Sequence, residues 1–204
     1  MNNITDWINP SLPKKLNSFK QEFSKGKPFP HILLPNFLKE SKANLLLASL
    51  KRENFIEKES DLFNFKQTHD LYFSKNKILK QFNSDLLSWD FFKIIEKITN
   101  SQFRGILDMS GSLYESTSFL LPHGDELEGR KIAYVLYLSK NFKSSDGGAF
   151  LLYNTKNNTP TTLAKKYPPA FNSLLLFEVS KISFHEVEEN LSKKSRYAIG
   201  GWLH

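Results

Sequence analysis

The sequence has no cysteine among its 204 residues. Disulfide bonds and zinc sites built on thiolates are therefore excluded, and any bound metal must use nitrogen and oxygen ligands. No apolar stretch approaches the roughly 18–20 residues that span a membrane, so we expect no membrane partner. The first residues also lack a positively charged segment followed by an apolar run, which excludes a secretory signal peptide. These absences predict an intracellular, cytoplasmic protein.

Acidic residues are outnumbered by basic ones, 21 against 28, which gives a formal net charge of +7. The basic residues are spread along the chain, and the most biased stretch runs from Lys14 to Lys27. A solvated, solubilising surface is the simpler explanation of this charge. Attraction to an acidic partner such as ribosomal RNA is the alternative.

The apolar pattern changes about half-way along the chain. The first hundred residues are typical of mixed, mostly helical structure, with apolar residues at helical spacing over 37–50 and 84–99. Beyond residue 100, short β-rich runs alternate with turn signals, at 131–138, 149–153, 173–179 and 196–203. Asp146-Gly147-Gly148 favours a β-hairpin turn, because these residues tolerate positive φ angles. Helices followed by many short strands predict an α+β domain built on an antiparallel sandwich or jelly roll.

His123 and Asp125 stand just ahead of a long apolar run. Positions i and i+2 of a β-strand point to the same side, so the two side chains can aim at one point. Jelly rolls take metal ligands from strands distant in sequence, and His185 supplies a third ligand just beyond the apolar run SLLLFEV. Two histidines and one carboxylate are the ligand set of non-haem Fe(II) oxygenases. A zinc site with the same ligands stays open.

Arg196 begins the last β-rich run, eleven residues after His185. A guanidinium inside a β-barrel is costly unless it meets an anion, and its planar fork fits a carboxylate through two parallel hydrogen bonds. An intramolecular salt bridge is the alternative role.

These residues lie in segments that resemble the ribosomal prolyl hydroxylases, a group of Fe(II)- and 2-oxoglutarate-dependent oxygenases. The segments are similar in order and spacing, and they read HGDELEGRKIAYVLYL, DGGAFLLY, FNSLLLFEVSKISFHEVEE and SRYAIGGWLH. The similarity extends upstream through ILDMSGSLYES and KPFPHILLPNFL. It implies one oxygenase domain over 27–204 with a double-stranded β-helix core and supporting helices, preceded by a basic, helical segment over 1–26.

The resemblance also implies the roles of individual residues. The Fe(II) ligands would be His123, Asp125 and His185. Arg196 would pair with the distal carboxylate of 2-oxoglutarate, Tyr137 would hydrogen-bond the same carboxylate, and Tyr114 would line the cosubstrate pocket. From the residues alone, Tyr137 shares the parity of Asp125 and could face the barrel interior, although an ordinary core aromatic is the alternative. O2 would be the other cosubstrate and L-ascorbate the reductant.

Three features depart from the family pattern. Gly124 stands where relatives often carry a second acid, which bears on substrate contacts. Ala198 stands where related enzymes often have Ser or Thr, so we expect one hydrogen bond to the cosubstrate to be missing. The eukaryotic relatives continue beyond the position of His204 into a second, non-catalytic barrel, so the resemblance covers their catalytic domain. Of the other histidines, His31 and His69 are predicted to be structural or exposed.

The implied reaction is hydroxylation of an unactivated C–H bond on a proline in a decoding-centre loop of the small-subunit ribosomal protein uS12, with incidental contact to ribosomal RNA. Within the oxygenase class, a small molecule or a nucleic-acid base is the alternative substrate. A non-catalytic, cupin-like metal-binding barrel would share the ligand triad but would not need Arg196. A nucleic-acid-binding module would explain the charge but not the triad.

Overall fold

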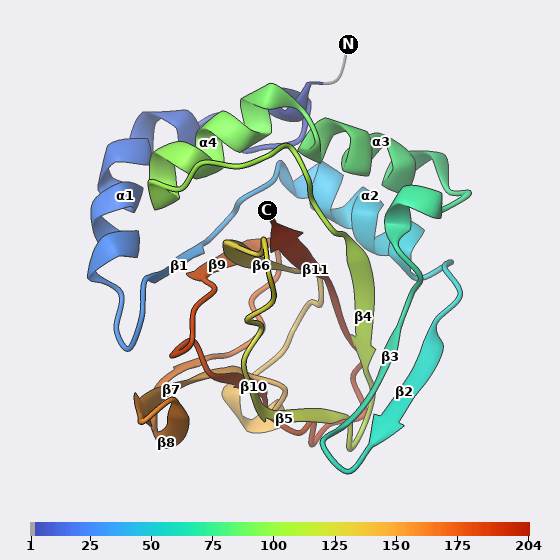
Figure 1. The fold of residues 1–204 in the computed structure, drawn as a ribbon. Coiled ribbons are helices and arrows are strands. Elements are labelled where there is room, and N and C mark those ends of the chain that lie inside the picture. Colours follow the sequence, from blue (N-terminus) through green and yellow to red (C-terminus); the bar gives the residue numbers. More distant parts are fainter. Residues whose placement is uncertain (1–2) are drawn as a thin grey trace.

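One curled antiparallel sheet forms the frame of the molecule. The computed structural model describes residues 3–204, and within this range the strand order is β1-β9-β6-β11-β4-β3-β5-β10-β7-β8, with β2 beside β3. The sheet bends round so that its two halves face each other as the walls of a barrel (Figure 1). The predicted α+β jelly-roll class is thereby confirmed.

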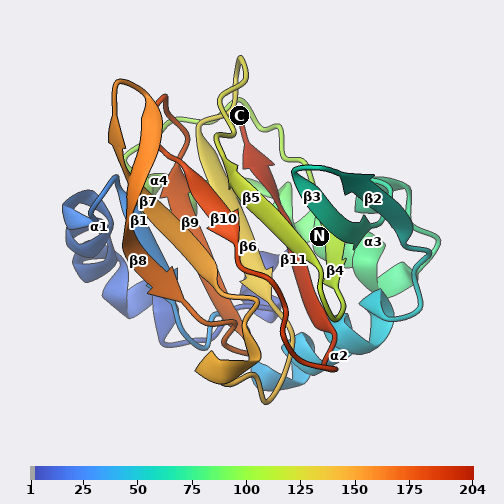
Figure 2. The same ribbon diagram turned by 90° about the horizontal axis from the view of Figure 1, so that it is seen from below.

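The two walls differ in size, and a hairpin joins them. The large wall consists of β1 (His31–Leu34), β9 (Ser173–Glu178), β6 (Ile132–Tyr137), β11 (Arg196–Leu203) and β4 (Ser110–Tyr114). The small wall consists of β5 (Phe119–His123), β10 (His185–Val187), β7 (Phe150–Lys156) and β8 (Thr159–Tyr167). The hairpin of β2 (Ile56–Ser60) and β3 (Phe63–Gln67) closes one side, because β3 pairs with both β4 and β5. Figure 2 shows this hairpin at the edge of the barrel.

Helices cover the outer face of the large wall (Figure 1). They are α1 (Leu16–Lys25), α2 (Glu40–Leu50), α3 (Lys77–Leu86) and α4 (Trp89–Thr99). The main apolar core lies between them and the strands, where Phe91 and Ile95 of α4 belong to the same buried cluster as Leu136 and Ile199. Side chains alternate along β6 and β11, so one set packs against the helices and the other set points into the barrel interior. Within residues 3–204, none of the helices is long and apolar enough to cross a membrane.

A buried carboxylate connects the N-terminal segment to the helical layer. Asp85 is 3% exposed and accepts hydrogen bonds from the Trp7 indole nitrogen (2.7 Å), the Asn3 amide (2.8 Å) and the Gln81 side chain (3.0 Å). Short helical turns at Ile4–Asp6 and Leu12–Lys15 precede α1 in this segment. Its apolar side chains pack into the same core as α4, so the segment is integral to the helical layer.

Two details of the sequence prediction are wrong. The single helix expected over 84–99 is interrupted, because the Ser88 hydroxyl accepts from the Phe91 amide and starts α4 as a separate helix. Asp146-Gly147-Gly148 does not form a hairpin, since β6 and β7 lie in different walls. Its glycines have positive φ angles of 71° and 66°, and a Cβ on Gly147 would clash with the backbone oxygen of Glu189.

The four β-rich runs expected in the second half are strands whose ends lie within three residues of the expected bounds, and β11 matches its expected bounds at both ends. The strands of the first hundred residues, β1, β2 and β3, were not expected from the pattern. β2 is almost wholly exposed and β3 half-buried along its whole length, so neither has the alternation that marks a strand in a sequence.

Candidate functional site

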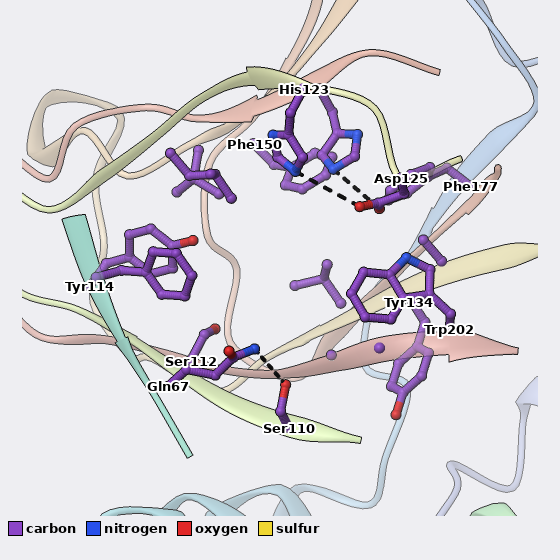
Figure 3. A pocket seen from close by; sticks show the side chains of 18 of the residues that line it. Gln67, Ser110, Ser112, Tyr114, His123, Asp125, Tyr134, Phe150, Phe177 and Trp202 are labelled. Atoms are coloured by element: carbon purple, nitrogen blue, oxygen red, sulfur yellow. Dashed lines mark hydrogen bonds and ion pairs between the residues drawn. The ribbon is translucent and has the colours of Figure 1, made fainter. Parts of the chain in front are cut away.

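His123, Asp125 and His185 bring three ligand atoms to one place. These atoms lie within 4.8 Å of one another. Strand pairing causes this, because His123 at the end of β5 is the register partner of His185 at the start of β10. Asp125 follows two residues later, with carboxylate oxygens 3.4 Å from Nε2 of His185 and 3.9 Å from Nε2 of His123 (Figure 3).

Hydrogen bonds orient both imidazoles for metal binding. Nδ1 of His123 lies 2.9 Å from the backbone oxygen of Leu121, and Nδ1 of His185 lies 3.0 Å from that of Ser183. Since a carbonyl oxygen only accepts, each Nδ1 carries the hydrogen and donates, and each Nε2 presents its lone pair to the cluster. Burial lowers the pKa of His185, which keeps the ring neutral. One carboxylate and two imidazoles with Nε2 toward the cluster therefore fit a divalent iron or zinc ion.

Arg196 lies deep in the barrel between two tyrosines. It is 1% exposed, and its guanidinium carbon lies 4.9 Å from the ring centre of Tyr114 and 5.2 Å from that of Tyr137. Nε and Nη2 of Arg196 and the hydroxyl of Tyr137 are buried without a hydrogen-bond partner among residues 3–204. No carboxylate in this range forms an ion pair with Arg196 either, so the alternative of an internal salt bridge is not borne out. Orphaned donors around a buried cation fit an anionic ligand.

Tyr114 and Tyr137 are protonated, so their hydroxyl groups can donate hydrogen bonds to an anionic ligand. Burial raises the pKa of Tyr137 to about 12, although the charge of Arg196 acts in the opposite direction. Burial also raises the pKa of Tyr114. Both phenols therefore keep their protons at neutral pH and remain able to donate hydrogen bonds.

A cavity of about 190 Å³ connects the ligand cluster with Arg196. Most of its lining is apolar, including Phe65, Leu120, Ala133, Val135, Phe150, Phe177 and Val187. Figure 3 shows Gln67, Ser110 and Ser112 on the wall that faces His123 across the cavity. An apolar pocket with a few aimed polar groups is typical of a small-molecule or cofactor site.

Trp202 borders the cavity on the side of Asp125 (Figure 3). Its indole nitrogen is buried and has no hydrogen-bond partner among residues 3–204. The guanidinium of Arg130 stacks 3.4 Å above the indole ring and also donates to the backbone oxygen of Asp125. Sequence reasoning missed Trp202, although a signal existed, because it lies six residues after Arg196 on one strand and so has the same parity.

The other histidines stand apart from the ligand cluster. His31 is buried and bonds to the backbone oxygen of Phe29 and the hydroxyl of Tyr167. His69 is exposed, and His204 pairs with Asp108 at 2.9 Å. The structure thus brings together the six residues singled out from the sequence, around one cavity lined by five of them and backed by the buried Tyr137.

Comparison with known proteins identifies the family. Residues 109–204 match the family model of the 2OG-Fe(II) oxygenase superfamily. The prolyl 3-hydroxylase OGFOD1 of Xenopus laevis is 40% identical over 183 residues, covering 87% of this chain and 35% of that protein. The chain belongs to the 2OG-Fe(II) oxygenase superfamily. The resemblance in the sequence is confirmed, and the chain spans about a third of the length of the curated relatives it matches.

Solved structures share the fold of this oxygenase. A prolyl hydroxylase of Trichoplax adhaerens, in complex with a hypoxia inducible factor peptide fragment, has a TM-score of 0.75 at 20% identity and covers 96% of this chain and 93% of its own. HygX of Streptomyces hygroscopicus, with nickel and 2-oxoglutarate bound, has a TM-score of 0.67 at 14% identity and covers 89% and 85%. Likeness at these identities shows the fold alone, which is the predicted double-stranded β-helix.

Proposed function

We propose that this chain is an Fe(II)- and 2-oxoglutarate-dependent dioxygenase that hydroxylates a prolyl residue of the ribosomal protein uS12. The observation that carries the chemistry is that three ligand atoms and a buried guanidinium, unpartnered among residues 3–204, face one cavity. The names of the Xenopus and Trichoplax relatives support a prolyl substrate. The motif resemblance to the ribosomal prolyl hydroxylases supports uS12.

In this proposal His123, Asp125 and His185 would hold Fe(II) through one ligand atom each, so three protein ligands would not saturate the ion. The Nδ1 hydrogen bonds keep each Nε2 aimed at the ion, and Phe150, stacked 5.0 Å from His185, limits rotation of that ring. When bound, Fe(II) and 2-oxoglutarate use O2 to convert a C–H bond to a hydroxyl group, with succinate and CO2 as the other products. L-ascorbate is the reductant that keeps the iron ferrous.

Arg196 binds the distal carboxylate of 2-oxoglutarate through Nε and Nη2, which are both buried and have no hydrogen-bond partner among residues 3–204. Their parallel hydrogens form the planar fork that matches two carboxylate oxygens. Tyr137 donates its hydroxyl hydrogen to the same carboxylate, and Tyr114 covers the guanidinium with its ring. Because these groups are buried, water does not compete for the bonds.

The open end of the cavity suits a prolyl residue. A proline ring has no acidic proton, so general-base catalysis would not functionalise it, whereas iron-based oxidation would. The apolar lining fits the ring, and the free indole N–H of Trp202 beside Asp125 would donate to the carbonyl oxygen of the same peptide. The excess of basic residues would favour approach to ribosomal RNA or to nascent ribosomal protein beside it.

The test incubates the purified protein with Fe(II), ascorbate, 2-oxoglutarate and a peptide covering the decoding-centre loop of uS12. Mass spectrometry should find one added oxygen atom on a proline, and a peptide with alanine at that position should remain unmodified. Asp125→Ala should give no product, because the carboxylate ligand is lost.

Two other results would change the conclusion. If 2-oxoglutarate is consumed in the presence of a small molecule or a nucleic-acid base, with no oxygen on peptide or intact uS12, the oxygenase assignment stands and the ribosomal substrate is refuted. If 2-oxoglutarate neither binds nor turns over, the chain is a metal-binding barrel of another function.

A further inference from the structure

Ala198 lies at the centre of four polar side chains on the inner face of the large wall. Arg196 precedes it by two residues on β11, so both side chains point into the barrel, where Ala198 belongs to the inner apolar cluster. Its register partner on β4 is Ser112, and its register partner on β6 is Tyr137. Tyr114 is in turn the register partner of Arg196. Since adjacent strands lie about 4.8 Å apart, Ser112 and Tyr137 flank the methyl group of Ala198 from either side.

Ser112 has a hydroxyl group that the fold itself does not use. It lines the cavity, and its neighbour Ser110 on the same face of β4 accepts a hydrogen bond from Gln67 at 2.9 Å. Ser112 has no such partner among residues 3–204, and Figure 3 shows it on the wall between Tyr114 and Ser110. A half-buried hydroxyl without a protein partner beside a buried cation is positioned for a ligand.

We propose that Ser112 donates a hydrogen bond to the carboxylate held by Arg196 and is therefore a further cosubstrate-binding residue. The inference rests on the proposed function, because that carboxylate belongs to 2-oxoglutarate. A carboxylate offers about four acceptor sites, so the fork of Arg196 and the hydroxyl of Tyr137 leave room for another donor. Ala198 has no hydroxyl group for a hydrogen bond to this carboxylate, and Ser112 on the neighbouring strand supplies that bond instead.

Position along the strand distinguishes Ser112 from Ser110. The register pairs Ser112 with Ala198 and Ser110 with Gly200, two residues farther from Arg196. Two residues of a strand span about 6.6 Å, roughly twice the length of a hydrogen bond, so a carboxylate bonded to Ser112 is too far from the hydroxyl of Ser110. Ser110 therefore lies out of reach of the distal carboxylate, and Ser110→Ala is the comparison variant on the same strand.

The experiment titrates 2-oxoglutarate into the Fe(II)-loaded protein by calorimetry in the absence of O2. Ser112→Ala should weaken binding about tenfold, the loss expected for one hydrogen bond to a charged group. The double variant Ser112→Ala/Ala198→Ser should recover most of the affinity, because it returns a hydroxyl to the same spot from β11. Ser112→Thr keeps the hydroxyl and should bind as the wild type does. Ser110→Ala removes a hydroxyl from the same wall and should weaken binding much less than Ser112→Ala, and Fe(II) affinity should be equal in all variants.

The outcomes separate the two proposals. Wild-type affinity in Ser112→Ala would overturn the role of Ser112, and so would an equal loss in Ser110→Ala, which would indicate a general disturbance of β4. Failure of Ala198→Ser to restore binding in the Ser112→Ala background would also overturn it. A wild-type protein that does not bind 2-oxoglutarate would instead overturn the proposed function on which this inference rests.

Discussion

Replacing Arg196 with methionine should make the cosubstrate-free protein more stable and insensitive to its cosubstrate. Arg196 is 1% exposed, and two of its nitrogens have no partner among residues 3–204. A charge without a counter-ion in the interior costs several kcal/mol. The rings of Tyr114 and Tyr137 offset this by only about 0.5–2 kcal/mol each.

The expected gain follows from removing that cost. Methionine is unbranched and adaptable, so it can occupy most of the same space without a charge. We expect the free energy of unfolding of the cosubstrate-free protein to rise by about 1–3 kcal/mol. For a chain of this length this corresponds to a rise of about 2–12 °C in the unfolding temperature. In the wild type, 2-oxoglutarate at one hundred times its Kd should add about 2.7 kcal/mol, and Arg196→Met should lose this increment.

Scanning calorimetry of the metal-loaded protein, with and without 2-oxoglutarate, measures both effects. Arg104→Met is the matched control, because it removes an exposed guanidinium and should leave both the unfolding temperature and the cosubstrate effect unchanged. A cosubstrate-free Arg196→Met protein that unfolds well below the wild type would refute the reasoning, since Arg196 would then support the fold and not the ligand.

Three further changes test other parts of the structure. Trp202→Phe should raise KM for the uS12 peptide about three- to tenfold, because it removes the unpartnered indole N–H and keeps an aromatic ring beneath Arg130. The Kd of 2-oxoglutarate should not change, and unchanged steady-state kinetics would contradict this role. Asp85→Ala should lower the free energy of unfolding in urea by about 2–4 kcal/mol, because the buried donors of Trp7 and Asn3 lose their acceptor; kcat per folded molecule should not change, and a selective loss of kcat would argue for another role. Burial lowers the pKa of His31 from its usual 6.5. Between that lowered pKa and pH 6.5, the unfolded chain therefore binds more protons than the folded chain. The free energy of unfolding then falls as the pH falls through this window. His31→Gln should therefore show a smaller drop in unfolding temperature between about pH 7 and about pH 5; a drop as large as that of the wild type would exclude His31 as its source.

Local patterns were sufficient for the four most apolar strands of the barrel, β6, β7, β9 and β11, and for the choice of candidate ligands. Runs such as 131–138 and 196–203 are apolar enough to require burial, and a short segment between turn signals can be buried on both faces only inside a layered sheet. The spacing of His123 and Asp125 indicated a shared direction, because alternation along a strand is a local property of the chain. The motif resemblance then added Tyr114 and the role of Tyr137, and it identified the anion expected at Arg196 as 2-oxoglutarate.

Polar edge strands could not be predicted in the same way. β8 is exposed along most of its length, and it is a strand because it pairs with β7 at the end of the sheet. The break between α3 and α4 depended on a single cap, the Ser88 hydroxyl, inside an otherwise continuous helical pattern. In both cases a polar interaction determined the structure, namely the backbone pairing of β8 with β7 and the Ser88 cap of α4, and the pattern of apolar residues does not include it.

The sequence by itself determined which residue types are available for a metal site and for a carboxylate site. It also determined which side chains of a strand share one face, because that alternation depends only on neighbours along the chain. Only the tertiary structure decided which strands meet, since register is set by contacts between segments far apart in sequence. That register places His185 opposite His123 and sets Ser112 beside Ala198. It also leaves Arg196 buried, with no counter-ion among residues 3–204, which no local pattern can specify.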